Sequence, residues 1–293
     1  MRALSLKGFT LAGLVMAATP GLIAQKAPFG ITADTHTPAV RAVRGGGAEA
    51  SALKGAYALS FSGALVGANI FSRQAGEIGS IIANGKGQII GGEIDFTSVQ
   101  NTLMSLPVTG TYILNADGTG ALTLVTSQFT QSFSLFAAEV NGKVTSATVV
   151  QTDGAAGTSG SLVKQKAAGA PAGNFSFNLS GETFETSGTP NAVAVSGTLD
   201  IIDGFVVGAA GFFVGDASHG AAAVIPPQGF PASVSTPDAY GRFTLSISFS
   251  SLAGEALPPV TFAAYTVDAT HFTLLPITAP SENVPLLIGF AVQ

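Results

Sequence analysis

The sequence predicts an all-β protein made of two tandem antiparallel units, and three observations support this fold class. Large apolar residues alternate with small polar ones in Gly55–Gly63 (GAYALSFSG), and Gly173–Gly181 (GNFSFNLSG) repeats the pattern. Such alternation gives a strand one buried and one wetter face. Turn-forming dipeptides separate further alternating runs, and no convincing amphipathic helix pattern interrupts them, so we expect a β-meander.

The first unit is expected to span residues 53–166. Asn84-Gly85, Asp117-Gly118 and Asn141-Gly142 lie between alternating runs, and these dipeptides favour tight hairpins because both residues tolerate positive φ. The pattern therefore predicts about eight strands joined by short turns. The expected strands are residues 55–63, 76–83, 88–96, 108–114, 121–126, 129–138, 143–150 and 160–165.

The second unit is expected to span residues 173–293, after a short Ala/Gly/Pro link at 167–172. It repeats landmarks of the first unit in the same order, which indicates a duplication, and two units are too few for a solenoid. Besides the opening strand, the matched landmarks are Asp117–Leu124 with Asp238–Leu245, Phe136–Ala138 with Phe262–Ala264, and the closing strand ending in Gln165 with Gly289–Gln293.

The second unit also contains a long segment, Asp216–Pro237, with four prolines. Long connections between strands are either functional or merely tolerated insertions. We favour a tolerated insertion, and the functional interpretation stays open.

Eight short antiparallel strands can close into a small barrel or fold as a sandwich. Closure removes sticky sheet edges, which matters in a chain with few charges. An eight-stranded barrel is wide enough to be filled by side chains or to hold one small ligand. The 20 Phe residues favour a filled interior, whereas Tyr57, Phe61, Phe175 and Phe177 would line a ligand cavity if one exists.

The N-terminus predicts export. Arg2 and Lys7 precede an apolar run, Phe9–Ala18, and a passable cleavage signal ends at Ala24. This arrangement is typical of a secretory signal peptide over residues 1–24, and the run is short for a membrane anchor of about 20 residues. Residues 25–52, rich in Gly and Pro, are then a flexible linker. Periplasm, cell surface and medium remain equally open as destinations.

Composition excludes several classes of function. The net charge is −5 and only 10% of the residues are charged, so the chain lacks the basic footprint of a nucleic-acid-binding protein. It has no Cys, which excludes disulfides, thiolate metal sites and Cys nucleophiles. It also shows no phosphate-binding loop or dinucleotide fingerprint, so we expect no cofactor.

Two resemblances follow from these residues. Gly55-Ala-Tyr57 and Gly173-Asn-Phe175 resemble the Gly-x-aromatic start of lipocalin- and avidin-like barrels, in which the aromatic side chain plugs the closed end, although the usual Trp is absent. The first unit is also similar to a repeat of uncharacterised exported proteins from environmental bacteria. That likeness implies export and tandem β units and implies no activity. It rests on Leu53–Gly63, Ile89–Asp95, Gly110–Gly120 and Gly160–Gln165.

Glu93 and Asp95 are the most interesting acids. They lie two residues apart in one expected strand, so they share a face, opposite Ile90, Ile94 and Phe96. Paired carboxylates bind Ca²⁺ or act as acid and base, but neighbours on one strand do not easily flank a substrate. We expect a solvated outer face and treat both residues as weak metal candidates.

The other polar motifs give weak signals. Asp216 and His219 lie close in sequence but without an oxyanion architecture, and His36 and His271 lie far from them. Ser161 and Lys164 match a Ser-x-x-Lys motif, but a strand would place them on opposite faces.

The first functional hypothesis is an exported, non-catalytic β protein with a structural, adhesive or surface-interaction role. The alternative is a carrier of a small apolar ligand in a barrel cavity, and the third is a hydrolase with a site at Glu93/Asp95 or Asp216/His219. An outer-membrane barrel is disfavoured by the absence of Trp, the 4 Tyr residues and the short strands. We expect no nucleic-acid partner and no membrane span after signal removal.

Overall fold

The structure is a computed structural model, and every regular element in its described residues is a β-strand, which confirms the all-β class. These residues form two closed barrels in tandem within one compact unit that begins at Gly46. The described residues are 52–65, 74–98, 100–166, 169–182, 192–203, 205–214, 222–223, 232–247, 259–279 and 286–293. The predicted signal peptide and nearly all of the predicted linker lie outside them.

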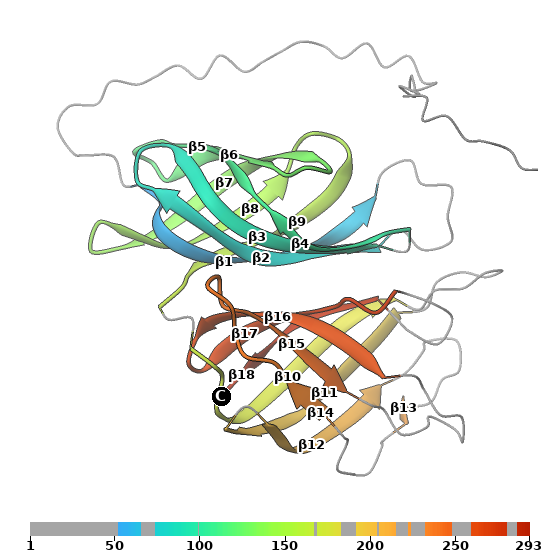
Figure 1. The fold of residues 1–293 in the computed structure, drawn as a ribbon. Helices are drawn as coiled ribbons and strands as arrows, with labels where there is room; N and C mark the ends of the chain where they lie inside the picture. The colour runs from blue at the N-terminus through green and yellow to red at the C-terminus, as the bar shows by residue number, and fades with distance from the viewer. Residues whose placement is uncertain are drawn as a thin grey trace, which may run out of the picture. The chain divides into compact units, whose positions relative to one another are not determined.

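The first barrel is an eight-stranded antiparallel meander (Figure 1). Hydrogen bonding runs β1-β2-β3-β5-β6-β7-β8-β9 and closes from β9 onto β1, while β4 pairs with β3 beside this circuit. The strands are β1 (Lys54–Leu65), β2 (Gln74–Asn84), β3 (Gln88–Ser98), β4 (Thr102–Pro107), β5 (Thr109–Leu114), β6 (Thr119–Val125), β7 (Thr130–Val140), β8 (Lys143–Gln151) and β9 (Ala156–Lys164).

The second barrel repeats this connectivity (Figure 1). Its circuit is β10-β11-β12-β14-β15-β16-β17-β18, closing from β18 onto β10, with β13 paired to β12 beside it. The strands are β10 (Gly173–Glu182), β11 (Ala192–Ile202), β12 (Phe205–Val214), β13 (Ala222–Ala223), β14 (Ala232–Val234), β15 (Arg242–Ile247), β16 (Val260–Asp268), β17 (His271–Pro276) and β18 (Leu286–Val292).

The matching turns before β6 and β15 fix the correspondence between the barrels and correct the alignment expected from sequence. Gly118 and Gly241 both have positive φ, and their carbonyls accept from the amides of Ala137 and Thr266. Leu122 therefore corresponds to Leu245, whereas the sequence alignment had matched Leu124 to it. The error arose because aligning the two Asp residues ignored the turn geometry.

Two further landmarks shift for the same reason. Leu122 pairs with Phe133 and Leu245 pairs with Phe262, so Phe133 corresponds to Phe262, and not Phe136 as expected. In the closing strands, Tyr57 pairs with Lys164, and the equivalent register in the second barrel makes Gln293 the counterpart of Lys164 rather than of Gln165. The landmarks were in the right strands but one to three residues out of register.

A bulge in β3 changes which isoleucines face the core. The register shifts where Ile82 pairs with Gly91 and Ala83 pairs with Ile89. Ile89 is consequently buried and Ile90 is 60% exposed, so the expectation that Ile90 shares a face with Ile94 is wrong. Gly92 permits the bulge, because its φ is 144° and a Cβ there would collide with the Ser80 carbonyl.

The side chains that point into each barrel form its hydrophobic core. The first core is built around Tyr57, Phe61 and Phe133, and the second around Phe175, Phe243 and Phe272. Phe61 and Phe133 pack with ring centroids 4.8 Å apart. These aromatic residues are almost fully buried, so they supply much of the apolar area that stabilises each barrel.

Candidate ligand cavity in the first barrel

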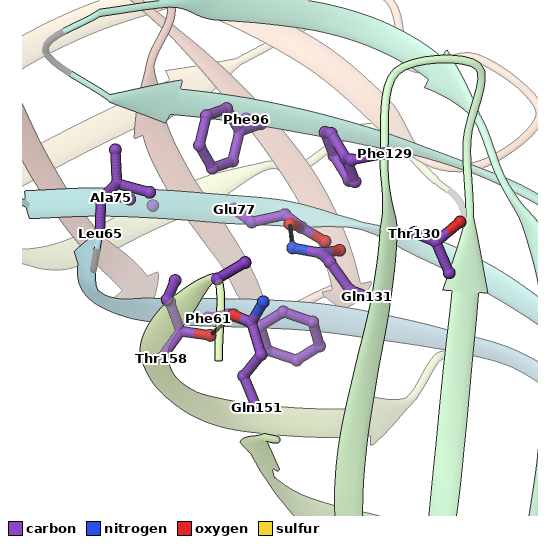
Figure 2. Close-up of a pocket in the computed structure, with 13 residues that line it drawn as sticks. Phe61, Leu65, Ala75, Glu77, Phe96, Phe129, Thr130, Gln131, Gln151 and Thr158 are labelled. Carbon is purple, nitrogen blue, oxygen red and sulfur yellow. Dashed lines mark hydrogen bonds between the residues drawn. The ribbon is translucent and has the colours of Figure 1, made fainter. Parts of the chain in front are cut away.

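One end of the first barrel contains a cavity of about 150 Å³. It lies where β1 and β8 end and β2, β7 and β9 begin, and Figure 2 shows its lining. Three rings, Phe61, Phe96 and Phe129, supply most of the apolar wall, and the polar groups come from β2, β7, β8 and β9. The lining residues are Phe61, Leu65, Ala75, Gly76, Glu77, Phe96, Phe129, Thr130, Gln131, Gln151, Ala155, Ala156 and Thr158.

Glu77 is the charged side chain in this lining. It follows Ala75 in the inward phase of β2, the same phase as Ile81 and Ala83, and it is 2% exposed. In the pairing of β1 with β2, Glu77 lies opposite Phe61. The alternation of the strand therefore carries a carboxyl group into the barrel interior, where apolar residues are the rule.

The carboxyl of Glu77 is only partly satisfied. Gln131 Nε2 donates to Glu77 Oε2 at 2.8 Å, as the dashed line in Figure 2 shows. Within the part of the chain that the structure describes, Glu77 Oε1 and Gln131 Oε1 are both buried without a hydrogen-bond partner. A buried oxygen without a hydrogen-bond partner lowers stability by about 1–3 kcal/mol, and by more if it is charged. A hydrogen-bond donor placed at this pair would relieve that cost.

A second polar pair lies on the neighbouring strands. Thr158 donates to Gln151 Oε1 at 2.6 Å, and Gln151 Nε2 donates to Asp153, at 2.9 Å to Oδ1 and 3.0 Å to Oδ2. Asp153 also accepts from the backbone amides of Ser132 and Ala155. Gln151 and Thr158 therefore have hydrogen-bond partners, and the unpaired oxygens in the cavity wall are those of Glu77 and Gln131.

Burial dominates the electrostatics of Glu77. Removal from water raises the pKa of this carboxyl from 4.5 to about 7, and the hydrogen bond from Gln131 lowers it by less. No charged group of the described residues contributes to this pKa shift. Around neutral pH, Glu77 therefore exists as a mixture of neutral acid and carboxylate.

The second barrel has apolar residues at all four equivalent positions. Phe61 pairs with Glu77 as Leu179 pairs with Val195, and Leu124 pairs with Gln131 as Ile247 pairs with Val260. The same registers match Gln151 with Pro276 and Thr158 with Leu287. All four counterparts are buried. The barrel fold therefore does not require the polar set of the first barrel.

The candidate lining residues predicted from sequence are divided between three places. Phe61 lines the cavity. Tyr57 lies at the opposite end of the same barrel, where its hydroxyl donates to the Val144 carbonyl at 3.1 Å and Lys164 Nζ lies 4.6 Å from its ring centroid. Phe175 and Phe177 belong to the core of the second barrel. Glu77 was missed, although an acid in the inward phase of an alternating run was the signal that could have found it.

The expectation that Glu93 and Asp95 lie on a solvated face is wrong. Asp95 is fully buried, and the Arg242 guanidinium of β15 donates two hydrogen bonds to it, from Nε at 2.8 Å and from Nη2 at 2.9 Å. Tyr265 donates to Asp95 Oδ2 at 2.7 Å, and the Ser105 amide donates to Oδ1 at 3.1 Å.

Glu93 belongs to the same cluster, with Oε1 at 3.3 Å from both Arg242 Nε and the Tyr265 hydroxyl. Burial raises the pKa of Glu93, as do Asp238 and Asp95, while Arg242 lowers it. The pKa of Tyr265 is also raised well above its usual value, first by burial and then by the two acids. The two carboxylates are thus occupied by a cation and a phenol that join β3 to β15 and β16.

Apolar contacts surround this ion cluster. Ile78 on the outer face of β2 packs with Tyr265, Leu275 and Ile288 of the second barrel, and Thr97 donates to the Pro276 carbonyl at 2.8 Å. Gly76 lies so close to Ile288 that a Cβ would collide with its side chain. The arrangement of Glu93 and Asp95 is that of a structural contact, which the sequence could not reveal because its partners lie far along the chain.

The remaining motifs do not converge on a site. Ser161 and Lys164 lie in β9, so the predicted strand there is confirmed. His271 begins β17 as expected, and its ring packs edge-on against Phe290. Asp216, His219 and His36 lie outside the described residues, as does most of the Asp216–Pro237 segment.

Across the described strands and turns, no three His, Asp or Glu side chains are grouped so as to hold a metal ion. The same residues include no helix of the length and apolarity needed to cross a membrane. No family model matches the chain, and the curated proteins contain no match to it.

Proposed function

We propose that this protein is an exported, non-catalytic binding protein whose first barrel holds a small ligand in the cavity around Phe61 and Glu77. The observation that carries the proposal is the contrast with the second barrel, where Val195, Val260, Pro276 and Leu287 replace the polar set. A buried carboxyl that the duplicated fold does not need costs stability, so a role outside folding accounts for it best.

The size and lining of the cavity agree with a small ligand. A cavity of about 150 Å³ is large enough for a molecule of the size of benzene. Phe61, Phe96 and Phe129 line the cavity with aromatic rings, and Glu77 and Gln131 are the polar residues of its wall that carry unpaired oxygens. A mostly apolar wall with a few fixed polar groups is the usual composition of a small-molecule site.

We do not assign catalysis to this site. A single carboxyl with one amide partner offers no nucleophile and base pair and no oxyanion donors, which acyl transfer requires. The acids proposed for a hydrolase, Glu93 and Asp95, are engaged by Arg242 and Tyr265.

Ligand retention tests the proposal directly. The full chain is produced by secretion from its native host, and native mass spectrometry measures any small molecule that stays bound. A cavity-filling variant, Ala75→Leu, should lose that mass, because Ala75 is 1% exposed and lines the cavity. The equivalent substitution in the second barrel, Val193→Leu, is the matched control and should keep it. Apo protein that also fails to bind small aromatic probes would refute the proposal.

A second role, in adhesion or surface interaction, is favoured by the outer face of β5 to β8. Ile113, Phe136 and Val150 are 61%, 52% and 44% exposed there, and their cross-strand partners on β6, β7 and β8 carry no charge. Exposed large apolar side chains on a face without charges are common at interaction sites, and here they stand among Ser, Thr and Ala residues. The outward residues are Thr109, Thr111, Ile113, Thr119, Ala121, Thr123, Val125, Thr130, Ser132, Ser134, Phe136, Ala138, Ser146, Thr148 and Val150.

Adsorption measurements separate this role from ligand carriage. Replacing Ile113 and Phe136 with Lys should reduce binding of the protein to an apolar surface several-fold, because it places two charges on the face. The same double substitution should leave ligand retention in the cavity unchanged. Unaltered adsorption would eliminate the second role.

A further inference from the structure

The polar atoms of the cavity restrict the chemistry of its ligand, and this inference rests on the proposed function. Glu77 Oε1 and Gln131 Oε1 are the two buried oxygens without partners among the lining side chains. Both act as acceptors when Glu77 is ionised, so a complementary ligand must donate hydrogen bonds. Neither oxygen has appreciable accessible surface, so the Glu77 and Gln131 side chains must rotate toward the ligand to accept these bonds. A purely apolar molecule would leave both oxygens unsatisfied.

The charges around the cavity favour a cation. On the walls, β1, β7, β8 and β9 contribute Phe61, Leu65, Gln131, Gln151, Ala156 and Thr158, none of which is charged. Lys143 and Lys164 lie at the opposite ends of β8 and β9.

The other charged groups of the described residues do not neutralise Glu77. Glu93 and Asp95 point away from the barrel interior on β3 and are held by Arg242. Asp153 follows β8, beside the Gln151 side chain, and is itself negative. Hydrogen bonds from Ala155, Ser132 and Gln151 outweigh its desolvation and lower the pKa of Asp153. Among the described residues, these charged groups near the cavity are therefore acids; Arg73, two residues before Ala75 in the sequence, lies outside the described residues.

The aromatic rings of the cavity also favour a cationic ligand. Phe96 and Phe129 pack with centroids 5.8 Å apart, and Figure 2 shows them on the other side of the carboxyl from Phe61. An ammonium group over an aromatic face is attracted by the ring quadrupole, and its three N–H donors are enough for both unpaired oxygens once the Glu77 and Gln131 side chains turn toward it.

We propose that the ligand of this cavity is a small primary amine bound as its ammonium ion, with the nitrogen at Glu77 and Gln131 and an apolar body against the three Phe rings. A charge-assisted hydrogen bond to a buried carboxylate is roughly twice as strong as a neutral one. The carboxylate thus gives the amine its advantage over neutral molecules of the same shape.

Three nearly isosteric probes test the inference on the full secreted chain: benzylamine, benzyl alcohol and ethylbenzene. Isothermal titration at about pH 8 should show benzylamine binding about ten-fold or more tightly than the other two, because only it compensates the buried charge. Glu77→Gln keeps the shape and removes the charge, so it should abolish this preference while ethylbenzene binding persists. Val195→Gln in the second barrel is the matched control and should leave the preference intact.

The pH dependence provides an independent readout. The amine binds the ionised carboxylate, and the pKa of Glu77 in the empty protein is about 7. Benzylamine affinity should therefore fall up to ten-fold per unit as the pH drops from about 7 to about 5, and this slope should vanish in Glu77→Gln.

The outcomes distinguish the two proposals. Binding of benzyl alcohol or ethylbenzene as tightly as benzylamine overturns the amine assignment and leaves a cavity that binds ligands. Binding of none of the three probes, together with no ligand retained from the host, overturns the proposed function itself.

Discussion

The two barrels share one strand order and differ in what they bury at equivalent positions. The first encloses Glu77 with Gln131, and the second encloses Val195 and Val260 in the same places. Because both barrels close, the polar pair is not a requirement of the fold. In a duplicated barrel, a buried polar residue can therefore be compared with the residue at the same position of the other barrel, which serves as an internal control for stability.

The outer faces differ in the opposite sense. In the second barrel, Arg242 and Tyr265 hold Asp95 of the first, whereas their counterparts in the first barrel are Thr119 and the half-exposed Phe136. Asp95 has a cation and several donors, while Glu77 has one amide. The two buried acids therefore differ in their partners: Asp95 pairs with a cation and joins the barrels, whereas Glu77 has only an amide donor.

The largest effect is expected from giving the second barrel the residue of the first at the ion cluster. Arg242→Thr leaves the fully buried Asp95 without its cation, and breaking a buried pair in this way costs about 3–5 kcal/mol. Denaturant unfolding of the full chain measures the loss.

The second substitution Asp95→Asn, added to Arg242→Thr, should recover part of that loss, since it removes the stranded charge. The reverse exchange, Thr119→Arg, lies on a partly exposed face and should change stability by less than about 0.5 kcal/mol. A loss below about 1 kcal/mol for Arg242→Thr would mean that the cluster does not hold Asp95 as the contacts indicate.

A smaller effect of opposite sign is expected from giving the first barrel the residues of the second. In Glu77→Val with Gln131→Val, the orphaned oxygens disappear and the free energy of unfolding should rise at alkaline pH. The pKa of Glu77 is about 7 in the folded protein and 4.5 in the unfolded chain, so the folded state binds more protons between these values. The wild type therefore loses stability as the pH rises from 4.5 to about 7, by on the order of 3 kcal/mol, and the variant does not.

Unfolding of both proteins at about pH 4.5 and pH 8 checks this difference, because other titrating groups cancel between them. The reverse exchange in the second barrel, Val195→Glu, should destabilise the protein, and more so at pH 8. An identical pH dependence in the wild type and the double variant would show that Glu77 titrates normally.

Local patterns predicted most of the architecture. Period-two alternation and the Asn-Gly and Asp-Gly turns gave both units and most strands, because these signals depend on neighbouring residues. The strand Thr102–Pro107 was not predicted, because its partly exposed and exposed residues do not alternate. The bulge at Ile90 reversed the inward phase expected from simple alternation.

The ion cluster and the cavity were harder to predict from the sequence than the strands, for a physical reason. Arg242 and Asp95 are 147 residues apart, and no local pattern encodes a contact of that kind. The solvated face expected for Glu93 and Asp95 assumed that acids lie in water, which fails where a distant guanidinium neutralises them. Glu77 lay in a correctly predicted strand, and only its phase relative to Ile81 distinguished it from a surface acid.

The smallest effect is expected at another ion pair that joins the two barrels. Lys166 Nζ lies 3.3 Å from Asp268 Oδ2, but the Lys166 side chain is 76% exposed, against 14% for Arg242. Lys166→Ala should change the free energy of unfolding by less than about 0.5 kcal/mol, because water screens an exposed pair and two mobile side chains must be ordered to form it. The pKa of Asp268 is lowered first by its hydrogen bonds from Thr270, so an NMR titration should find it still low in Lys166→Ala and raised in Thr270→Ala. If Lys166→Ala matched the loss from Arg242→Thr, burial would not be what separates these two ion pairs.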